Sequence, residues 1–253
     1  MNTKIGKLVM ADLEVLTVRK NIKNIHIGVY PPNGRVRVAA PLRTTDETIR
    51  LIVLSKIPWI RKQRDKFTRQ ERETPREYVT GESHHFMGQR YLLNVVQGAY
   101  RPGVQLNGMK RMDMCVNPRL SYENRARLME RFYRMELSRL LDSLVPKWEE
   151  KLNVHANDIR IRRMKTKWGS ANVNAKRIWF NLELAKKSPN CISYVVVHEL
   201  THLIEKNHNK RFRGIIESVM PNWKHYRDEL NSFISGDRDW NFVTENIQMK
   251  LKL

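Results

Sequence analysis

This chain has little cysteine and no long apolar run. Cys115 and Cys191 are its two cysteines, and they lack the paired spacing of a zinc finger or of a disulfide framework. We therefore expect reduced thiols, with Cys191 as a small core residue rather than a nucleophile. No segment approaches the roughly 20 apolar residues that cross a membrane, and the N-terminus carries no apolar segment with a cleavage site. These absences predict a cytoplasmic location and no membrane partner.

Acidic residues are also scarce relative to basic ones. The 253 residues include 47 Lys and Arg against 26 Asp and Glu, which gives a formal net charge of +21 and a pI near 10.2. Such an excess favours an anionic partner, although the charge is spread along the chain rather than confined to a tail. The densest basic run contains Arg160, Arg162, Arg163, Lys165 and Lys167.

This basic run has two interpretations. In a strand, Arg160 and Arg162 share one face, so they could line a groove that binds nucleic acid. Alternatively, the run is a solvated edge strand whose cations prevent aggregation. The sequence supports the two interpretations about equally.

The most informative motif is His198-Glu199-Leu200-Thr201-His202, followed by His208. On a helix, His198 and His202 lie on one face about 6 Å apart along the axis, so both can bind one metal ion. Glu199 then lies beside the ion, where a carboxylate can accept the proton of a zinc-activated water that attacks a carbonyl. The motif predicts a Zn²⁺ hydrolase with Glu199 as the catalytic general base.

The third metal ligand depends on where the helix ends. In a continuous helix, His208 would lie about 240° around the axis from His202 and would face away from the metal. We therefore expect the helix to end near Lys206-Asn207, since Asn tolerates the left-handed conformation, and His208 to turn back towards the ion. A solvated His208, with Glu217 as the third ligand instead, is the alternative.

The residues around this motif predict a buried helix. They are apolar on nearly every side of the helical wheel: Ile192, Val195, Val196, Val197, Leu200, Leu203 and Ile204. Ionisable side chains in such a helix cost free energy unless a metal or a partner holds them. Ser188-Pro189 is a suitable cap and first turn for the helix.

The rest of the sequence predicts an α+β fold with a β-rich N-terminal module. Residues 1–100 should contain short strands at 15–18, 25–29, 35–39 and near 91–95, and one helix over 49–67 interrupted by Pro58. Residues 98–118, rich in Gly, Pro and Asn, are predicted to be a linker.

Residues 118–235 should form a small zincin-like metallopeptidase domain. One long helix, or a pair broken near Pro146, is expected over 121–152, with its inward side chains at Leu128, Phe132, Met135, Leu140 and Leu144. Strands at 158–164 and 177–181 precede the buried HExxH helix, and helices at 210–219 and 223–233 follow it. Residues 236–253 are an unassigned C-terminal tail.

The motifs of this domain resemble those of the YgjP-like metallopeptidase family, which is similar to the WLM and SprT-like zinc proteases. The resemblance is carried by residues 163–170, 178–181, 194–203, 207–208 and 212, with weaker matches at 40–41, 59–60 and 78–81. It implies that His198, His202 and His208 bind zinc and that Glu199 is the catalytic base. The sequence departs from the family pattern at Ala171, where many members have Cys, and at Arg213, where an aromatic residue is frequent.

We therefore predict a zinc metallopeptidase that acts on proteins or peptides, and recruitment to nucleic acid through the basic run is an additional hypothesis. The alternative is a basic nucleic-acid-binding protein with a structural, non-catalytic zinc site. Glu199 favours the enzyme, because a structural site needs no carboxylate beside an open coordination position. Three residues are candidates for stabilising the oxyanion, and the sequence does not choose among Tyr194, His225 and Tyr226.

Two further residues have alternative roles. Trp168 could line a substrate groove or pack in the core, and the sequence supports both equally. Met220 could form a floor beneath the metal, although an ordinary core methionine is favoured.

Overall fold

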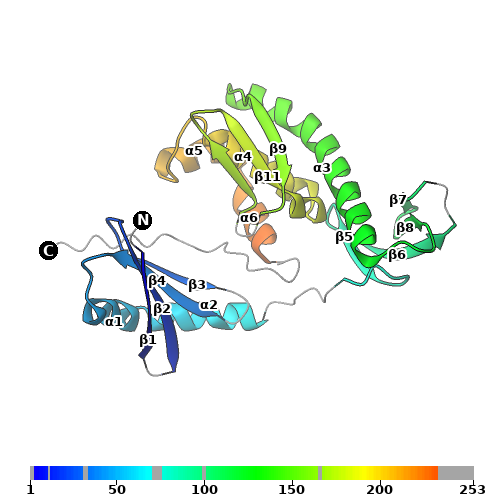
Figure 1. Cartoon of the computed structure of the whole chain (residues 1–253). Coiled ribbons are helices and arrows are strands. Elements are labelled where there is room, and N and C mark those ends of the chain that lie inside the picture. The colour runs from blue at the N-terminus through cyan, green and yellow to red at the C-terminus, as the bar shows by residue number, and fades with distance from the viewer. Residues whose placement is uncertain are drawn as a thin grey trace. The chain divides into compact units, whose positions relative to one another are not determined.

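The computed structural model describes residues 3–10, 12–30, 34–69, 76–98, 101–164 and 167–232 (Figure 1). The chain divides into two compact units, the first containing residues 1–72 and the second residues 73–236. Three small sheets combine with helices, which confirms the predicted α+β class. The predicted C-terminal tail, residues 236–253, lies outside the described residues.

The first unit contains a four-stranded sheet in the order β1-β2-β4-β3. Strands β2 and β4 are parallel, whereas β1 pairs with β2 and β3 pairs with β4 in antiparallel register. The bounds are β1 (Lys4–Met10), β2 (Leu13–Lys20), β3 (His26–Tyr30) and β4 (Arg35–Pro41).

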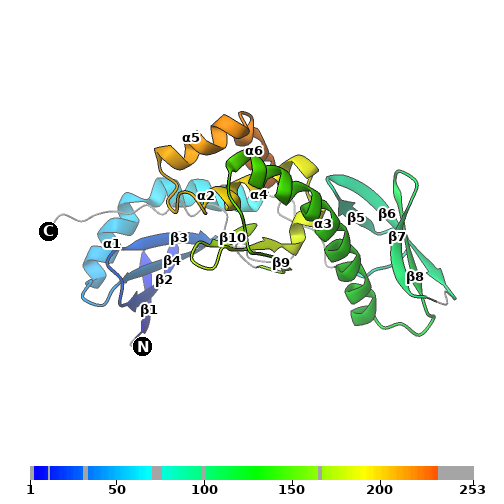
Figure 2. The ribbon, with the colours of Figure 1, turned by 90° about the horizontal axis from the view of Figure 1, so that it is seen from above.

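Helices α1 (Asp46–Ser55) and α2 (Ile57–Arg69) cover one face of this sheet (Figure 2). Thr45 caps α1 by accepting a 3.2 Å hydrogen bond from the Thr48 amide. The single interrupted helix predicted over 49–67 is therefore two helices, because the chain leaves α1 at Lys56, and Pro58 falls in the first turn of α2, where no helical amide is needed. The core beneath the helices includes Leu13, Val15, Val36, Val38, Ile49, Val53 and Ile60.

The second unit begins with another four-stranded sheet, in the order β5-β6-β8-β7. Its strands are β5 (Ser83–Phe86), β6 (Gln89–Gln97), β7 (Gly103–Asn107) and β8 (Arg111–Val116). The linker predicted over residues 98–118 is wrong, because this segment contains β7 and β8. Two of its glycines, Gly98 and Gly108, have positive φ values of 82° and 66°, which suit turns between strands.

A single long helix, α3 (Tyr122–Leu152), follows this sheet and continues through Pro146. Ser121 caps its start, and the left-handed residue Asn153, at φ 50°, ends it. One side of α3 packs against α4 (Pro189–Thr201). Figure 1 shows α3 running from the sheet of β5 to β8 to the region of α4. The helix thereby joins this sheet to the part of the unit that holds the HExxH motif.

A three-stranded sheet, a 3₁₀ helix and three α-helices complete the described part of the second unit. In the sheet, the order is β10-β11-β9, with β9 (Asp158–Arg162), β10 (Gly169–Asn172) and β11 (Arg177–Asn181). A 3₁₀ helix, η1 (Leu182–Lys186), leads into α4, which is followed by α5 (Lys210–Val219) and α6 (Trp223–Ser232). Within the residues that the structure describes, no helix is long and apolar enough to cross a membrane.

Candidate metal centre

The HExxH motif lies on the buried helix α4, as predicted. Ser188 begins the helix by accepting a hydrogen bond from the Cys191 amide at 3.3 Å, and Pro189 lies in the first turn. Residues 191–197 and 199–201 are all buried, and the helix contacts α3, α5, α6 and β10. Packing on several sides fixes the direction in which the motif's side chains point.

Three imidazoles converge at the end of α4. One ring nitrogen of each of His198, His202 and His208 lies within 4.8 Å of the others, and the Nε2 atoms of His198 and His208 are 3.0 Å apart. In a tetrahedral zinc site with bonds of about 2.0 Å, ligand nitrogens lie roughly 3.3 Å apart. This donor set therefore fits one metal ion, with His208 on the solvent side.

The chain reaches His208 by a different route from the one predicted. Helix α4 ends at Thr201 with His202 as its C-cap, so the predicted end near Lys206-Asn207 is wrong. Asn207 does not have a positive φ. The chain instead turns through hydrogen bonds from the amides of Leu203 and Glu205 to the carbonyls of Leu200 and Thr201, each 2.9 Å long.

Backbone and side-chain contacts hold the imidazoles in position. His202 Nδ1 lies 3.3 Å from the Glu205 carbonyl, which favours a proton on that nitrogen and leaves Nε2 for a metal. The Phe212 ring, 2% exposed, lies 4.7 to 5.0 Å from all three imidazole centroids. Asn209 caps α5 by accepting from the Phe212 amide at 2.9 Å. The cap thus helps to place the aromatic residue that supports the cluster.

The surroundings keep the imidazoles neutral. Burial, followed by the neighbouring His202 and His208, lowers the pKa of His198 to about 3. Burial also lowers the pKa values of His202 and His208. Neutral imidazole is the form that binds a metal, so the cluster is ready for ligation at neutral pH.

Glu199 is buried against β10. Burial raises the pKa of its carboxyl to about 8, while Lys167 and the Ala171 backbone amide oppose this rise. A Cβ atom on Gly169 would lie 2.5 Å from both Cγ and Oε1 of Glu199, closer than any real contact. The carboxylate therefore occupies space that only glycine leaves open.

Glu217, the rival third ligand, lies outside the cluster. It is on α5 with a 55% exposed side chain, and its carboxylate is 3.6 Å from Lys224 Nζ. The described His, Cys, Asp and Glu residues include one group of at least three side chains that could hold a metal ion. This group is His198, His202 and His208. The structure thus brings together the predicted histidines.

Of the three oxyanion candidates, Tyr194 lies beside the cluster. Its ring centroid is 5.9 Å from that of His198, and it stacks on Trp223 at 6.3 Å. Burial raises the pKa of Tyr194 to about 12, so its hydroxyl stays protonated and can donate a hydrogen bond. His225 and Tyr226 contact each other on α6.

Three other residues noted in the sequence are core residues. Trp168 is 5% exposed and Met220 8%, which favours packing over substrate contact. Burial raises the pKa of the Cys191 thiol to about 11, which makes it a poor nucleophile at neutral pH.

Asn181, which is fully buried, has a role that was not predicted. Its amide nitrogen donates to the carbonyls of Met164 at 3.1 Å and Lys167 at 2.7 Å. Its carboxamide oxygen accepts from the amides of Met164 and Glu183. Asn181 therefore fixes the chain on both sides of residues 165–166, just before the strand that packs on Glu199. A single buried Asn at the end of a strand has no distinctive pattern in the sequence.

Two residues of the basic run, Arg160 and Arg162, lie in the edge strand β9, and the arginines of the run have local partners. Arg160 pairs with Asp158 at 2.8 Å, and Arg163 lies 3.5 Å from Glu130 and 3.7 Å from Glu183. The guanidinium groups of Arg160 and Arg162 lie over the Trp179 ring at 5.4 and 4.6 Å. Lys167 is exposed, and Lys165 lies outside the described residues. These contacts favour the solvated edge strand over a free groove.

Comparisons with known proteins identify the family of the chain. A family model described as "YgjP-like, metallopeptidase domain" matches residues 23–233, which include the histidine cluster and Glu199. A search of curated proteins gives no significant match. The metallopeptidase zymogen abylysin of Pyrococcus abyssi is similar, with 21% identity and a TM-score of 0.34 over 36% of this chain and 90% of that one. The zymogen jannalysin of Methanocaldococcus jannaschii is similar with 21% identity, a TM-score of 0.33 and coverages of 36% and 93%.

Proposed function

The chain belongs to the YgjP-like metallopeptidase family, and from this membership we propose that it hydrolyses peptide bonds with zinc at His198, His202 and His208 and with Glu199 as general base. The observation that carries the proposal is the convergence of three neutral imidazoles within 4.8 Å at the end of a buried helix. Three imidazoles leave a fourth tetrahedral position open, which is typical of a catalytic zinc site in a zincin-like domain.

The roles of the residues follow from their positions. A bound zinc ion would supply a Lewis acid that polarises the substrate carbonyl and acidifies water. His198, His202 and His208 would hold it, and Phe212 would keep water from the inner side of the cluster. Glu199 would take a proton from the attacking water and return it to the leaving amine. Tyr194, protonated and next to His198, is our candidate donor to the oxyanion.

The test compares metal content and peptide cleavage in two matched variants. Glu199→Gln should keep one zinc per chain but lose about 100-fold or more in the rate of cleavage, because the amide cannot accept the proton. Glu217→Gln makes the same chemical change at an exposed position outside the cluster, and it should retain both zinc and activity. Cleavage by Glu199→Gln at the wild-type rate would exclude Glu199 as the base, and loss of zinc from Glu217→Gln would restore Glu217 as a ligand.

Nucleic-acid recruitment through the basic run has weaker support. Arg160 and Arg163 already pair with carboxylates, and Arg162 lies over Trp179. The alternative of a purely structural zinc site leaves the buried Glu199 without a function. Peptide hydrolysis is therefore the better-supported function.

A further inference from the structure

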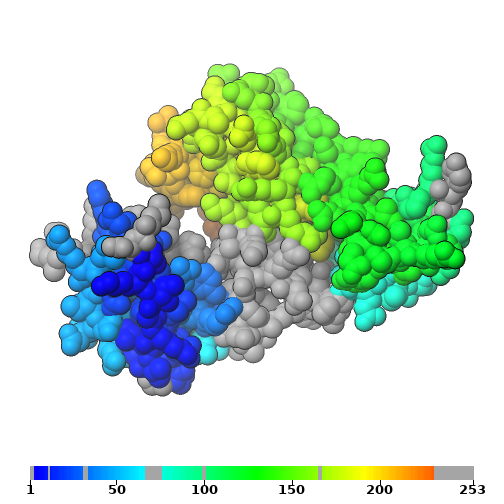
Figure 3. Space-filling model, viewed as in Figure 1, coloured from blue at the N-terminus to red at the C-terminus, as the bar shows by residue number. Residues whose placement is uncertain are grey.

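The sheet of the first unit has a second face that α1 and α2 do not cover. Side chains alternate along a strand, so Arg35 and Arg37 project away from Val36 and Val38, which lie in the core under the helices. The space-filling view shows strands β1 and β2 at the surface of this unit (Figure 3). We use the name open face for the side chains of Leu16, Tyr30, Arg35 and Arg37.

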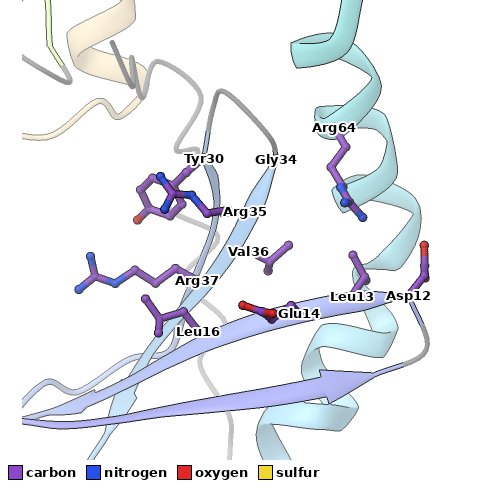
Figure 4. A pocket seen from close by; sticks show the side chains of 10 residues that line it. All are labelled: Asp12, Leu13, Glu14, Leu16, Tyr30, Gly34, Arg35, Val36, Arg37 and Arg64. Carbon is purple, nitrogen blue, oxygen red and sulfur yellow. The ribbon is translucent and has the colours of Figure 1, made fainter. Parts of the chain in front are cut away.

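The open face adjoins a hollow of about 550 Å³ at the end of the sheet where β2 and β4 begin. Figure 4 shows Tyr30, Arg35 and Arg37 on one side of the strands, and Arg64 reaching from α2 at the other. The stem of Arg64 packs on Gly34, where a Cβ atom would lie 2.5 Å from its Cγ. Three guanidinium groups therefore border one hollow.

Tyr30 lies along its own strand. A Cβ atom on Gly28 would be 2.6 Å from Cε2 of Tyr30 and 2.9 Å from its Cζ and hydroxyl oxygen, so the ring covers Gly28 on the same face. The side chain is half-buried. An aromatic ring that rests on a sheet in this way leaves its outer surface available for stacking by a planar group.

The strand register places arginines beside this ring. Tyr30 is opposite Arg35, and Gly28, under the ring, is opposite Arg37. On the other side, Leu16 of β2 is the register partner of Arg37 and is 43% exposed. The open face thus combines an aromatic platform, two cations and an exposed apolar side chain.

The acidic residues at this end of the sheet have cations of their own. Glu14 pairs with Lys7 at 2.7 Å, and Asp12 lies 4.0 Å from Arg61. Within the part of the chain that the structure describes, no carboxylate lies within ion-pairing distance of Arg37. Arg37 therefore contributes a positive charge to the hollow, which favours an anion there.

We propose that the open face binds single-stranded nucleic acid, with a base stacked on Tyr30 and the flanking phosphates at Arg35 and Arg37. Charge complementarity supports this ligand, since residues 1–72 contain 16 Lys and Arg against 6 Asp and Glu. An acidic peptide would satisfy the arginines but would leave the aromatic platform unused. In a duplex the bases are stacked inside, so the platform selects a single strand. The proposal does not depend on the metal centre.

The test is the binding of a fluorescent 12-nucleotide single strand to the full chain, measured by anisotropy at several salt concentrations. Arg37→Glu should weaken binding at least tenfold and reduce the salt slope by about one or more. Arg50→Glu is the matched control, because it makes the same charge change at an exposed position on α1, and it should weaken binding less than about threefold.

Substitutions of Tyr30 test the stacking of a base separately from the binding of phosphates. Tyr30→Leu should weaken binding on the order of tenfold with an unchanged salt slope, since stacking releases no counterions, whereas Tyr30→Phe should bind like the wild type. Equal losses in Arg37→Glu and Arg50→Glu would overturn the proposal. So would a wild type that does not bind the strand, or that binds a 12-residue glutamate peptide, a duplex or a mononucleotide as tightly as the strand.

Discussion

Gly169 leaves the space that the Glu199 carboxylate, our proposed general base, occupies. Its φ is not in the left-handed region, so glycine is needed here for space rather than for backbone conformation. Gly169→Ala should displace Glu199 and lower kcat/KM for peptide cleavage on the order of 10- to 100-fold, with zinc content unchanged. Gly214→Ala is a suitable control, because a Cβ atom there meets nothing within 4 Å. Full activity of Gly169→Ala would show that the contact does not position the base.

His84 should make the stability of the second unit depend on pH. Burial, then Arg76, lowers its pKa to about 4, against the opposing effects of Glu82, and Lys186 adds to the lowering. The unfolded chain therefore binds a proton between pH 6.5 and 4 that the folded chain does not, so stability falls as the pH falls through this window. His84 lies opposite Tyr91 and its ring is 5.8 Å from that of Tyr78.

The measurement for His84 is the free energy of unfolding as a function of pH. The wild type should lose on the order of 1 to 3 kcal/mol between pH 6.5 and 4 that His84→Gln does not lose, because Gln does not titrate. Parallel curves for the two proteins would exclude His84 as the source.

The sequence identified the three histidines that the fold brings together, but not the residues that position them. The spacing of His198 and His202 defines a metal site locally, because a helix fixes which side chains share a face. The roles of Gly169 and Asn181 arise from contacts with residues 30 and 14 positions away, which no local pattern encodes. The pairing of His208 with the cluster was predicted, although the turn that produces it was not.

At the scale of secondary structure, the cap of α5 should control how firmly His208 and Phe212 are held. Asn209→Ala removes the hydrogen bond from the Phe212 amide, which should cost about 1 kcal/mol of stability and weaken zinc binding severalfold. Ser121→Ala removes the corresponding cap of α3, at 3.4 Å from the Asn124 amide. It should cost similar stability but leave zinc affinity, measured by competition with a chelator, unchanged.

The inward face of α3 shows why helix faces are harder to predict than helices. Phe132 is buried as expected, but Met135 is 44% exposed, and Leu128, Leu140 and Leu144 are only half-buried. The fully buried side chains of α3 include Leu137, Leu141 and Val145 instead. Leucines are frequent on more than one side of this helix, so its apolar pattern does not define a single face. Packing against α4 and η1 determines which side of α3 is buried.

At the scale of the whole molecule, composition and periodicity were sufficient for the fold class. Alternating apolar residues predicted the strands β2, β3 and β4, and their register then follows from burial of one face. The boundary between the two units is harder to predict from the sequence. Gly and Asn occur both in linkers and in hairpin turns, so the segment that forms β7 and β8 had the composition of a linker.

Metal removal should affect the protein locally. A ligand that binds the folded state stabilises it by an amount that grows with its concentration over Kd, about 4 kcal/mol at a thousandfold excess. Chelation should therefore increase hydrogen exchange in residues 198–212 of the second unit while leaving β1 to β4 of the first unit unchanged. His202→Ala should exchange like the chelated wild type, with no further response to the chelator. Equal increases in both units would show that the chelator acts on something other than the histidine cluster, since the cluster lies wholly within the second unit.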